Sequence, residues 1–438
     1  MPELATTGPT VPAGAPARRS LRILVHDYSG HPFQVQLSRA LAARGHEVLH
    51  VHCDSYRTGK GAVSPRPGDP AGFTVEALGL GRRFERYRVA RRLGQELRYG
   101  RSFSARAARF APDVVLSSND PLFAKARMAS WCRRSSTPWV FWLQDLYSLA
   151  MAGYAAARWG GPGRLLGRGF QALERRLLHE AAEVVAISHD FLALLGRWGV
   201  DPRRCHVVEN WAPLAELPTR PRDNPWARSH GLAGRPVVLY SGTLGLKHDP
   251  SLLSRLARRV HDQGAAVVVV SEGAGAAWLH RERERGGLDN LVVLGYQPFE
   301  DLPDVMGTAD VVVALLDPAA GAFSVPSKVL TYLCAGRPVV GAIPAANLAA
   351  RTIERAGAGL VVPPDDGDAL LEAVAGLLED PGRRARLGDR GRRYAEATFA
   401  LAGIVERFEA ILARAASSGP RTASSGSQPG RWHGGAAG

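Results

Sequence analysis

The chain has 438 residues, of which 45% are hydrophobic and 22% charged, and its 55 Lys and Arg against 41 Asp and Glu leave a net charge of +14. This composition is typical of globular proteins and excludes a largely disordered, collagenous or membrane-embedded chain. The longest apolar runs fall far short of the ~20 residues that a membrane-spanning helix needs. Residues 1–20 also lack the apolar core of a secretory signal. The length predicts two large domains.

The cysteines and lysines are few, and their positions are informative. The four cysteines are scattered without CxxC spacing, which argues against a disulfide or zinc scaffold and predicts a reducing, cytoplasmic setting. A basic chain favours anionic partners: nucleic acid, a lipid surface or phosphorylated small molecules. Most of the cations are arginines, and the lysines are only Lys60, Lys125, Lys247 and Lys328.

Short apolar, β-branched runs alternate with helical patterns along the chain. The expected strands are 22–25, 47–51, 113–116, 139–143, 183–187 and 206–208, and then 237–240, 267–270, 291–294, 309–316, 338–342 and 360–362. Such alternation predicts parallel sheets with helices on both faces. We therefore expect an α/β protein with two doubly wound, Rossmann-like sheets of about six strands each.

A cluster of prolines divides the two sets of strands. It predicts an interdomain linker at 216–235, because proline removes backbone donors and blocks regular structure. The first domain is then expected at 21–215 and the second at 236–399, followed by a helix at 400–415. Residues 1–20 and 416–438 are rich in Pro and Gly or in Ser and Gly, and we expect them to be disordered tails.

In open parallel sheets, ligands bind beyond the carboxyl ends of the strands, so the loops at those ends are the candidate sites. The loop after 237–240 contains Gly242 and Lys247, and Asp249 and Pro250 then suit a helix start. Exposed amides and a lysine at such a start form an anion site. A plain turn with a solvated lysine is the alternative.

A second loop of the second half places Ser327 as the expected N-cap of a helix that begins at Lys328. The start of a helix offers unpaired N–H groups and a partial positive charge to an anion. Two of the four lysines thus lie in two loops that would converge, and a diphosphate would fit between them. The alternative, a capped helix with a surface lysine, explains each of the two loops taken on its own.

A third loop, SEGAG at 271–275, resembles the beginning of a dinucleotide-binding fingerprint. Its sixth position is Trp278, and no acidic residue ends the next strand. These departures argue against a nicotinamide or flavin oxidoreductase.

Loops of the first half also follow expected strands. Gly30 and His31 lie in one that could approach a substrate, and Asp120 is expected to cap the helix that begins near Pro121. Asp145 follows a strongly apolar strand, where a functional and a structural role are equally open.

Several stretches together resemble one known family. They are VVLYSGTLGLKHDPSLL (238–254), LGYQPFEDLPDVMGTADVVVALL (294–316), SVPSKVLTYLCAGRPVVGAI (324–343) and AISHDFLALLGRWGVDPRRCHVVEN (186–210). With them, roughly residues 20–415 resemble the retaining, nucleotide-sugar-dependent glycosyltransferases of family 4, which have the GT-B fold. The resemblance is greatest to the colanic-acid-type branch, which builds bacterial exopolysaccharide and O-antigen.

The resemblance implies a nucleotide-sugar-dependent enzyme of the hexosyltransferase type. Its second domain would hold the donor, its first domain the acceptor, and its last helix would cross back onto the first domain. Tyr296 and Gln297 would lie beside the base. The residues expected to bind the donor are Gly242, Thr243, Tyr296, Gln297, Ser324, Ser327 and Thr331, those expected to bind the acceptor are Gly30 and His31, and the candidate catalytic residues are Lys247, Lys328, Asn119 and Asp145.

The chain departs from the family pattern at several positions. Thr243 stands where many members have an arginine, and Asn119 where a histidine often contacts the donor sugar. The two glutamates of the family motif fall on Phe323 and Thr331, so sugar recognition would need another residue, for which Asp317 is a candidate. These departures favour a second hypothesis, a non-catalytic GT-B-like partner that binds nucleotides or lipids in an assembly complex. The intact SGTLGLK and VPSK loops favour the enzyme.

The expected mechanism needs no metal or other cofactor. Lys247, Lys328 and the helix start would stabilise the diphosphate leaving group electrostatically, and no DxD-like cluster follows an expected strand. Retention of anomeric configuration is implied by the resemblance alone.

Two basic amphipathic segments lie in the first half, at 82–109, with ten arginines and two glutamates, and at 164–178. Such segments bind anionic lipid surfaces, which suits a lipid-linked saccharide acceptor and an enzyme peripheral to the inner face of the cell membrane. A solvated helix face is an equal alternative. Nucleic acid ranks last, since no nucleic-acid-binding module accompanies the charge.

Overall fold

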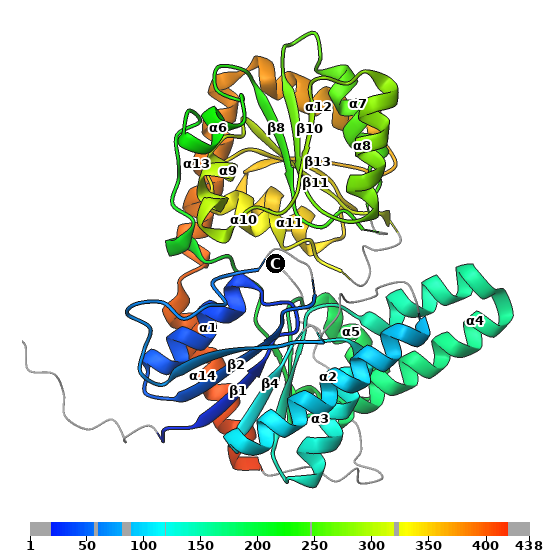
Figure 1. Cartoon of the computed structure of the whole chain (residues 1–438), viewed down its shortest axis with the longest axis vertical. Coiled ribbons are helices and arrows are strands. Elements are labelled where there is room, and N and C mark those ends of the chain that lie inside the picture. The colour runs from blue at the N-terminus through cyan, green and yellow to red at the C-terminus, as the bar shows by residue number, and fades with distance from the viewer. Residues whose placement is uncertain are drawn as a thin grey trace, which may run out of the picture.

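The computed structural model describes residues 19–56, 60–80, 89–118, 120–245, 248–318 and 324–418. Two α/β domains lie one above the other, the first coloured blue to green and the second green to orange (Figure 1). Each is built on a parallel sheet, with strand order β3-β2-β1-β4-β5-β6-β7 in the first and β10-β9-β8-β11-β12-β13 in the second. The two doubly wound sheets expected from the sequence are confirmed.

The first domain surrounds a sheet whose central strands are buried on both faces. On β1, Leu24 lies opposite Leu49 of β2 and Val115 of β4. The strands are β1 (Arg22–His26), β2 (Glu47–Cys53), β3 (Phe73–Leu78), β4 (Val114–Ser117), β5 (Trp139–Leu143), β6 (Glu183–Ala186) and β7 (Cys205–Val207). The helices are α1 (Pro32–Ala43), α2 (Val89–Phe110), α3 (Leu122–Arg134), α4 (Tyr147–Glu180) and α5 (Asp190–Arg197). The sequence analysis missed β3, a half-exposed strand at the sheet edge that lacks a continuous apolar run.

The second domain repeats this arrangement with shorter helices. Its strands are β8 (Val237–Ser241), β9 (Ala266–Val270), β10 (Leu291–Leu294), β11 (Val311–Leu315), β12 (Val339–Ala342) and β13 (Gly359–Val362). Its helices are α6 (Pro225–Ser229), α7 (Ser251–Arg259), α8 (Ala274–Gly286), α9 (Leu302–Gly307), α10 (Lys328–Cys334), α11 (Leu348–Ala356) and α12 (Gly367–Glu379).

The segment expected to be a linker contains helix α6. Asn224 caps this helix, and its side-chain amide donates hydrogen bonds to Asp304 O (3.0 Å) and Thr308 Oγ1 (3.1 Å). Trp226 of α6 is buried. Prolines here set the start of a short helix rather than excluding one, and that helix packs on the second domain.

The last two helices connect the domains in the manner expected. Helix α13 (Pro381–Thr398) contacts α10 and α12 of the second domain, and α14 (Leu401–Ser418) returns to the first. There the Phe408 ring lies 4.6 Å from that of Trp142, and Glu409 accepts a hydrogen bond of 2.8 Å from Arg44. Helix α14 extends into the expected tail as far as Ser418, whereas residues 1–18 and 419–438 lie outside the described residues.

Helix α4 is a hairpin, which the sequence analysis did not predict. Gly160 has φ +57° and ψ −123° and reverses the chain between two helical arms. The arms meet through small residues: a Cβ added at Gly163 would lie 1.9 Å from Ala155 O, and one at Gly167 2.7 Å from Ala152 Cβ. The hairpin projects sideways from the first domain (Figure 1). No helix in the described part of the chain is both long and apolar enough to cross a membrane.

Candidate functional site

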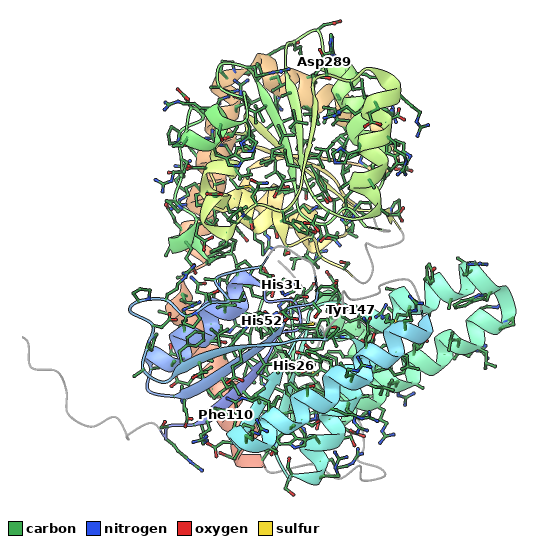
Figure 2. The ribbon with its side chains drawn as sticks, in the orientation of Figure 1. His26, His31, His52, Phe110, Tyr147 and Asp289 are labelled. Atoms are coloured by element: carbon green, nitrogen blue, oxygen red, sulfur yellow. The ribbon has the colours of Figure 1, made fainter. Side chains whose placement is uncertain are left out.

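The topology of both sheets points to the same place for a ligand. The strand order reverses between β1 and β4 in the first sheet and between β8 and β11 in the second. Ligands of doubly wound sheets bind beyond the carboxyl ends of the strands at such a reversal. His31 follows β1 and lies at the edge of the first domain that faces the second, whereas Asp289 lies at the remote end of the second domain (Figure 2).

Gly242 and Lys328 meet beyond the carboxyl end of β8 in the second domain. Gly242 follows β8 with φ +126°, a conformation that suits only glycine. A Cβ added at Gly242 would lie 3.2 Å from Lys328 Cε and 3.4 Å from its Nζ. The ammonium group also lies 3.6 Å from the ring centroid of Tyr240. The two loops that the sequence places near a diphosphate therefore do converge.

Tyr332 explains how Lys328 reaches this position. It follows Lys328 by one turn of α10, so both side chains lie on one face of the helix. The buried hydroxyl of Tyr332 accepts a hydrogen bond from Ser241 N (3.0 Å) and lies 3.2 Å from Ser241 O, to which it donates. This fastens α10 to the end of β8. Burial raises the pKa of Tyr332, so the hydroxyl keeps its proton.

The Thr243 and Tyr296 hydroxyls are 2.9 Å apart and share a hydrogen bond between the loops after β8 and β10. Gln297 lies beside Tyr296, but its side chain is engaged within the domain. Its Oε1 accepts a hydrogen bond from Trp226 Nε1 (3.0 Å), and its Nε2 donates to Gly295 O (3.0 Å). A base at this loop would meet the backbone of Gln297 rather than its amide.

The other residues expected to bind the donor are Ser327, Ser324 and Thr331. Ser327 occupies the N-cap position of α10, as expected, but it is exposed and its side chain makes no capping hydrogen bond. Its φ of −60° and ψ of −18° are helical, whereas a capping side chain needs an extended backbone. Ser324 is buried, and its carbonyl accepts a hydrogen bond from Asn347 (2.9 Å). Thr331 is half-buried on α10. Lys247, Asn119 and Phe323 lie outside the described residues.

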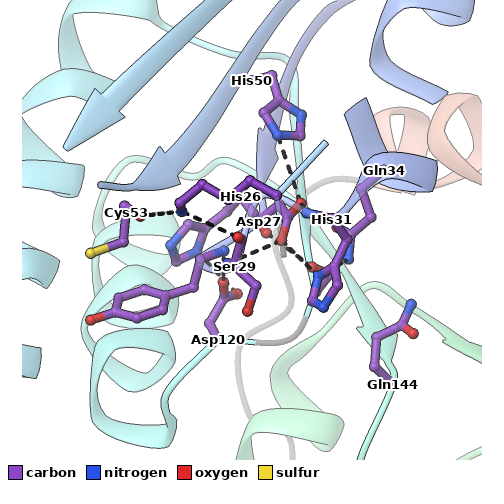
Figure 3. Close-up of polar contacts among 12 residues, drawn as sticks. His26, Asp27, Ser29, His31, Gln34, His50, Cys53, Asp120 and Gln144 are labelled. Atoms are coloured by element: carbon purple, nitrogen blue, oxygen red, sulfur yellow. Dashed lines mark hydrogen bonds and ion pairs between the residues drawn. The ribbon is translucent and has the colours of Figure 1, made fainter. Parts of the chain in front are cut away.

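On the first-domain side, the loop after β1 folds around the fully buried carboxylate of Asp27 (Figure 3). This carboxylate accepts hydrogen bonds from Ser29 N (3.2 Å) and His31 N (2.6 Å), and its Oδ1 lies 3.2 Å from His31 Nδ1. Gly30 makes the turn possible with φ +74°. The sequence analysis missed Asp27, although a carboxylate directly after an apolar strand was the available signal.

The surroundings of Asp27 fix both its charge and the orientation of His31. Burial alone raises the pKa of Asp27, but the charge and hydrogen bonds of His31, with the charge of His50, outweigh burial and lower it. Asp27 therefore stays ionised and holds a proton on His31 Nδ1. Nε2 of a neutral His31 is then the acceptor nitrogen of the ring. The imidazole is 22% exposed, so solvent can reach it.

A second buried carboxylate, Asp120, follows β4. It accepts hydrogen bonds from Tyr28 N (3.1 Å) and Ser117 Oγ (2.5 Å), and lies 3.1 Å from His26 Nδ1 and 3.7 Å from Lys125 Nζ. Burial lowers the pKa of Lys125 to about 8, against the opposing charge of Asp120. Asp120 thus forms a buried ion pair instead of the expected helix cap, since the N-cap of α3 is Pro121.

Asp145 lies near the start of α4, after the neighbouring strand β5. It is half-buried. Burial, with the charges of Tyr56 and Asp145, raises the pKa of Tyr147. The adjacent Gln144 accepts a hydrogen bond from Asn210 (2.5 Å).

A cavity of about 370 Å³ separates the domains beside the crossover helices. Ser327 lines it together with His189 and other residues of both domains. Two ion pairs bridge the domains, Arg351 to Asp190 at 2.6 Å and Arg355 to Glu209 at 3.7 Å. Within the described stretches, no three or more His, Cys, Asp or Glu side chains gather as a potential metal site.

The chain matches known proteins over both domains. A family model described as "Glycosyl transferase 4-like domain" matches residues 31–211, and one described as "Glycosyl transferases group 1" matches residues 235–380. A protein of Escherichia coli K12 named for colanic acid biosynthesis, the glycosyl transferase WcaI, is 24% identical over 304 residues, which are 68% of this chain and 74% of that protein. A GDP-mannose-dependent phosphatidylinositol monomannoside mannosyltransferase of Mycolicibacterium smegmatis is 31% identical over 43% of this chain and 49% of its own length.

Solved structures share the fold over nearly the whole chain. HepE of Anabaena, in complex with UDP and glucose, has a TM-score of 0.66 at 18% identity, covering 90% of this chain and 99% of that one. WaaG, a glycosyltransferase involved in lipopolysaccharide biosynthesis, has a TM-score of 0.63 at 17% identity, covering 89% and 99%. The matched family models follow the two domains in order, and the fold agrees with them. The chain therefore belongs to the family 4 glycosyltransferases of the GT-B fold, enzymes that use nucleotide-sugar donors.

Proposed function

We propose that this glycosyltransferase moves a hexosyl group from a nucleotide sugar on the second domain to a lipid-linked saccharide on the first. The transfer would retain the anomeric configuration and serve bacterial cell-surface polysaccharide biosynthesis at the inner face of the cell membrane. Relatives support this choice by their names, which refer to colanic acid, to lipopolysaccharide and to a phosphatidylinositol mannoside. The anionic membrane surface would then be the enzyme's other partner.

The observation that carries the proposal is Lys328 lying over Gly242. During transfer the bond between the anomeric carbon and the diphosphate oxygen breaks, and its electrons remain on the diphosphate. A fixed cation beside that oxygen stabilises the developing charge, because it is already oriented before the reaction. Tyr332, one turn further along α10, fastens to β8 the helix that carries Lys328. The glycine leaves the backbone open to the phosphate.

His31 and Asp27 are the first-domain counterparts of this site. With its Nδ1 turned to Asp27, His31 presents Nε2 as an acceptor for a hydroxyl group of the incoming saccharide. That hydroxyl oxygen bonds to the anomeric carbon and loses its proton. Asp27 is a positioning residue, since it is fully buried and acts through His31.

Nucleotide binding by the purified full chain is the direct test. Thermal unfolding is followed with UDP, GDP and their sugars, UDP first because HepE was solved with it. A ligand at a hundredfold excess over its Kd stabilises a folded protein by about 2.7 kcal/mol. Gly242→Ala should reduce this gain, because its Cβ displaces Lys328. Gly264→Ala is the matched control, since Gly264 also has positive φ (+65°) but no neighbour within 4 Å of an added Cβ.

A sugar-transfer assay distinguishes the enzyme from the non-catalytic alternative. A bound nucleotide sugar that is transferred to lipid-linked saccharide supports the proposal. Binding without transfer or hydrolysis favours the nucleotide-binding partner. A well-folded chain that binds none of the nucleotides contradicts both.

A further inference from the structure

Large hydrophobic side chains are unusually exposed on the hairpin α4. Around the reversal at Gly160 they are Tyr154 (43% exposed), Trp159 (42%), Leu165 (70%) and Leu166 (41%). Single exposed apolar residues are ordinary on soluble proteins, whereas a contiguous group marks a surface that another phase or molecule covers. We call this group, at residues 154–168, the hairpin tip.

The hairpin is built so that these side chains face outward. Its arms approach through Gly163 and Gly167, where the opposing arm leaves no room for even a Cβ atom. Bulky side chains consequently have no place between the arms. Tyr154 and Trp159 make an edge-to-face contact on the outside, with ring centroids 6.4 Å apart. The exposure is therefore a consequence of the packing of the arms.

Charged side chains, like the hydrophobic ones, are distributed unevenly along the hairpin. Exposed Arg158, Arg164 and Arg168 lie within the tip, and no acidic residue occurs from position 147 to 173. The two glutamates of α4 lie at the base. Glu174 is buried and accepts a hydrogen bond from Ser148 (2.6 Å), and Glu180 pairs with arginines. The tip thus combines exposed apolar groups with uncompensated positive charge.

We propose that the hairpin tip inserts into the headgroup region of an anionic lipid bilayer. Apolar and aromatic side chains would enter the boundary with the acyl chains, while the arginine stems extend their guanidinium groups to lipid phosphates. Because the hairpin projects beyond the rest of the first domain (Figure 1), its tip can reach a flat surface. This proposal rests on the part of the proposed function that names an anionic membrane surface as a partner, and it locates that contact; sugar transfer itself is not needed for it.

Other occupants fit the tip less well. Nucleic acid would pair with the arginines but leave Leu165 and Leu166 against phosphates. A second copy joined tip to tip would bring like charges together, because a two-fold interface places the same patch on both subunits. A lipid surface satisfies both the apolar and the cationic groups.

Vesicle flotation of the full chain tests the proposal. We expect binding to phosphatidylcholine vesicles that contain phosphatidylglycerol, weaker binding to phosphatidylcholine alone, and loss of binding at high salt. Leu165→Ser with Leu166→Ser should weaken the affinity about tenfold or more, and Arg164→Gln with Arg168→Gln about tenfold. The matched control is Arg281→Gln with Arg285→Gln, exposed arginines on α8 of the second domain, which should bind as wild type does.

All these substitutions are at exposed positions, so an unchanged thermal midpoint and nucleotide response will show that the variants are folded. Wild-type protein that stays unbound with anionic vesicles overturns the proposal, as does a leucine variant that floats like wild type. A dimer in size-exclusion chromatography that dissociates in the leucine variant would assign the tip to a second copy instead. Failure to bind nucleotide bears on the proposed sugar transfer and not on the membrane contact.

Discussion

Where the first domain faces the second, its loops are stabilised by buried ionised side chains. In the second domain the corresponding loops are fastened by hydroxyl groups near the ammonium of Lys328. Asp27 and Asp120 are fully buried carboxylates, and Lys125 beside Asp120 is nearly as buried. Across the cleft, the Tyr332 hydroxyl fastens α10, and Lys328 lies half-buried at its start.

This difference separates charges that hold the fold from a charge that lies where a ligand is expected. A buried ion pair already satisfies its members, and removing one of them leaves the other uncompensated. A hydroxyl that fastens a loop contributes a smaller free energy than a buried ion pair. Lys328, which lies beside Gly242 beyond the end of β8, is the cation expected to meet an anionic donor, and four changes test this contrast.

The largest effect is expected from Asp120→Ala. It leaves Lys125 and His26 buried without their carboxylate, which should lower the free energy of unfolding by about 3–5 kcal/mol in urea titration. Asp289→Ala is the matched control, because Asp289 is 82% exposed and lies at the remote end of the second domain (Figure 2). Its cost should stay within about 0.5 kcal/mol. Equal losses in the free energy of unfolding for Asp120→Ala and Asp289→Ala would contradict the idea that buried ions stabilise the first domain.

Lys125→Met should change how stability depends on pH. The pKa of Lys125 is about 8 in the folded protein, against 10.5 for an ordinary lysine. Between these values the unfolded chain binds more protons, so this lysine makes the free energy of unfolding rise with pH, by about 3 kcal/mol. The variant lacks that rise. Urea titrations of wild type and variant at several pH values give the difference in their free energies of unfolding, in which the other titrating groups cancel. If the two proteins show parallel pH profiles, the prediction is contradicted.

Lys328→Ala should spare the fold and weaken the donor site. Loss of hydrogen bonds to a charged group costs about 1.5–3 kcal/mol, which corresponds to an increase of about 10- to 150-fold in the Kd for the nucleoside diphosphate. Isothermal titration calorimetry measures it. Lys328→Arg, which keeps the charge, should recover part of the affinity. An unchanged Kd in the alanine variant would mean that the diphosphate lies elsewhere.

The smallest effect is expected at the hydroxyl pair. Thr243→Val and Tyr296→Phe each remove one partner of a 2.9 Å contact, and each should cost about 0.5–1.5 kcal/mol. If the pair acts as a unit, the double variant should cost less than the sum of the single ones in thermal or urea unfolding. Strict additivity would show that the two loops are held by other contacts.

Much of the architecture could be predicted because a parallel sheet covered on both faces needs continuous apolar strands. The strands at 139–143 and 291–294 were predicted to the residue. Strand β3 was missed because one edge of a sheet tolerates exposed polar residues. The α4 hairpin was missed because its reversal depends on one glycine conformation and on close packing of small side chains, neither of which changes the hydrophobic period.

The candidate site was predicted in part for the same reason. The approach of Gly242 and Lys328 follows from topology, since Gly242 directly follows β8 and Lys328 begins the helix after β11, the strand that pairs with β8 at the reversal point. Ser327 was predicted from its residue type as the N-cap of α10 and occupies that position, but its side chain does not cap the helix, because side-chain capping depends on the backbone angles of that one residue. Asp27 and Asp120 gave little signal, since their partners come from distant strands and helices.

The sequence by itself determined the order of strands and helices, the excess of arginine and the family, because hydrophobic period, composition and motif spacing are properties of the chain alone. The tertiary structure decided which charges face each other. It turned Asp120 and Lys125 into a buried pair, left Lys328 on the cleft and exposed the apolar tip of α4. These outcomes depend on distances between residues far apart in the sequence. Because charges interact more strongly in the low dielectric of the protein interior, burial increases the effect of each such distance on the electrostatic free energy.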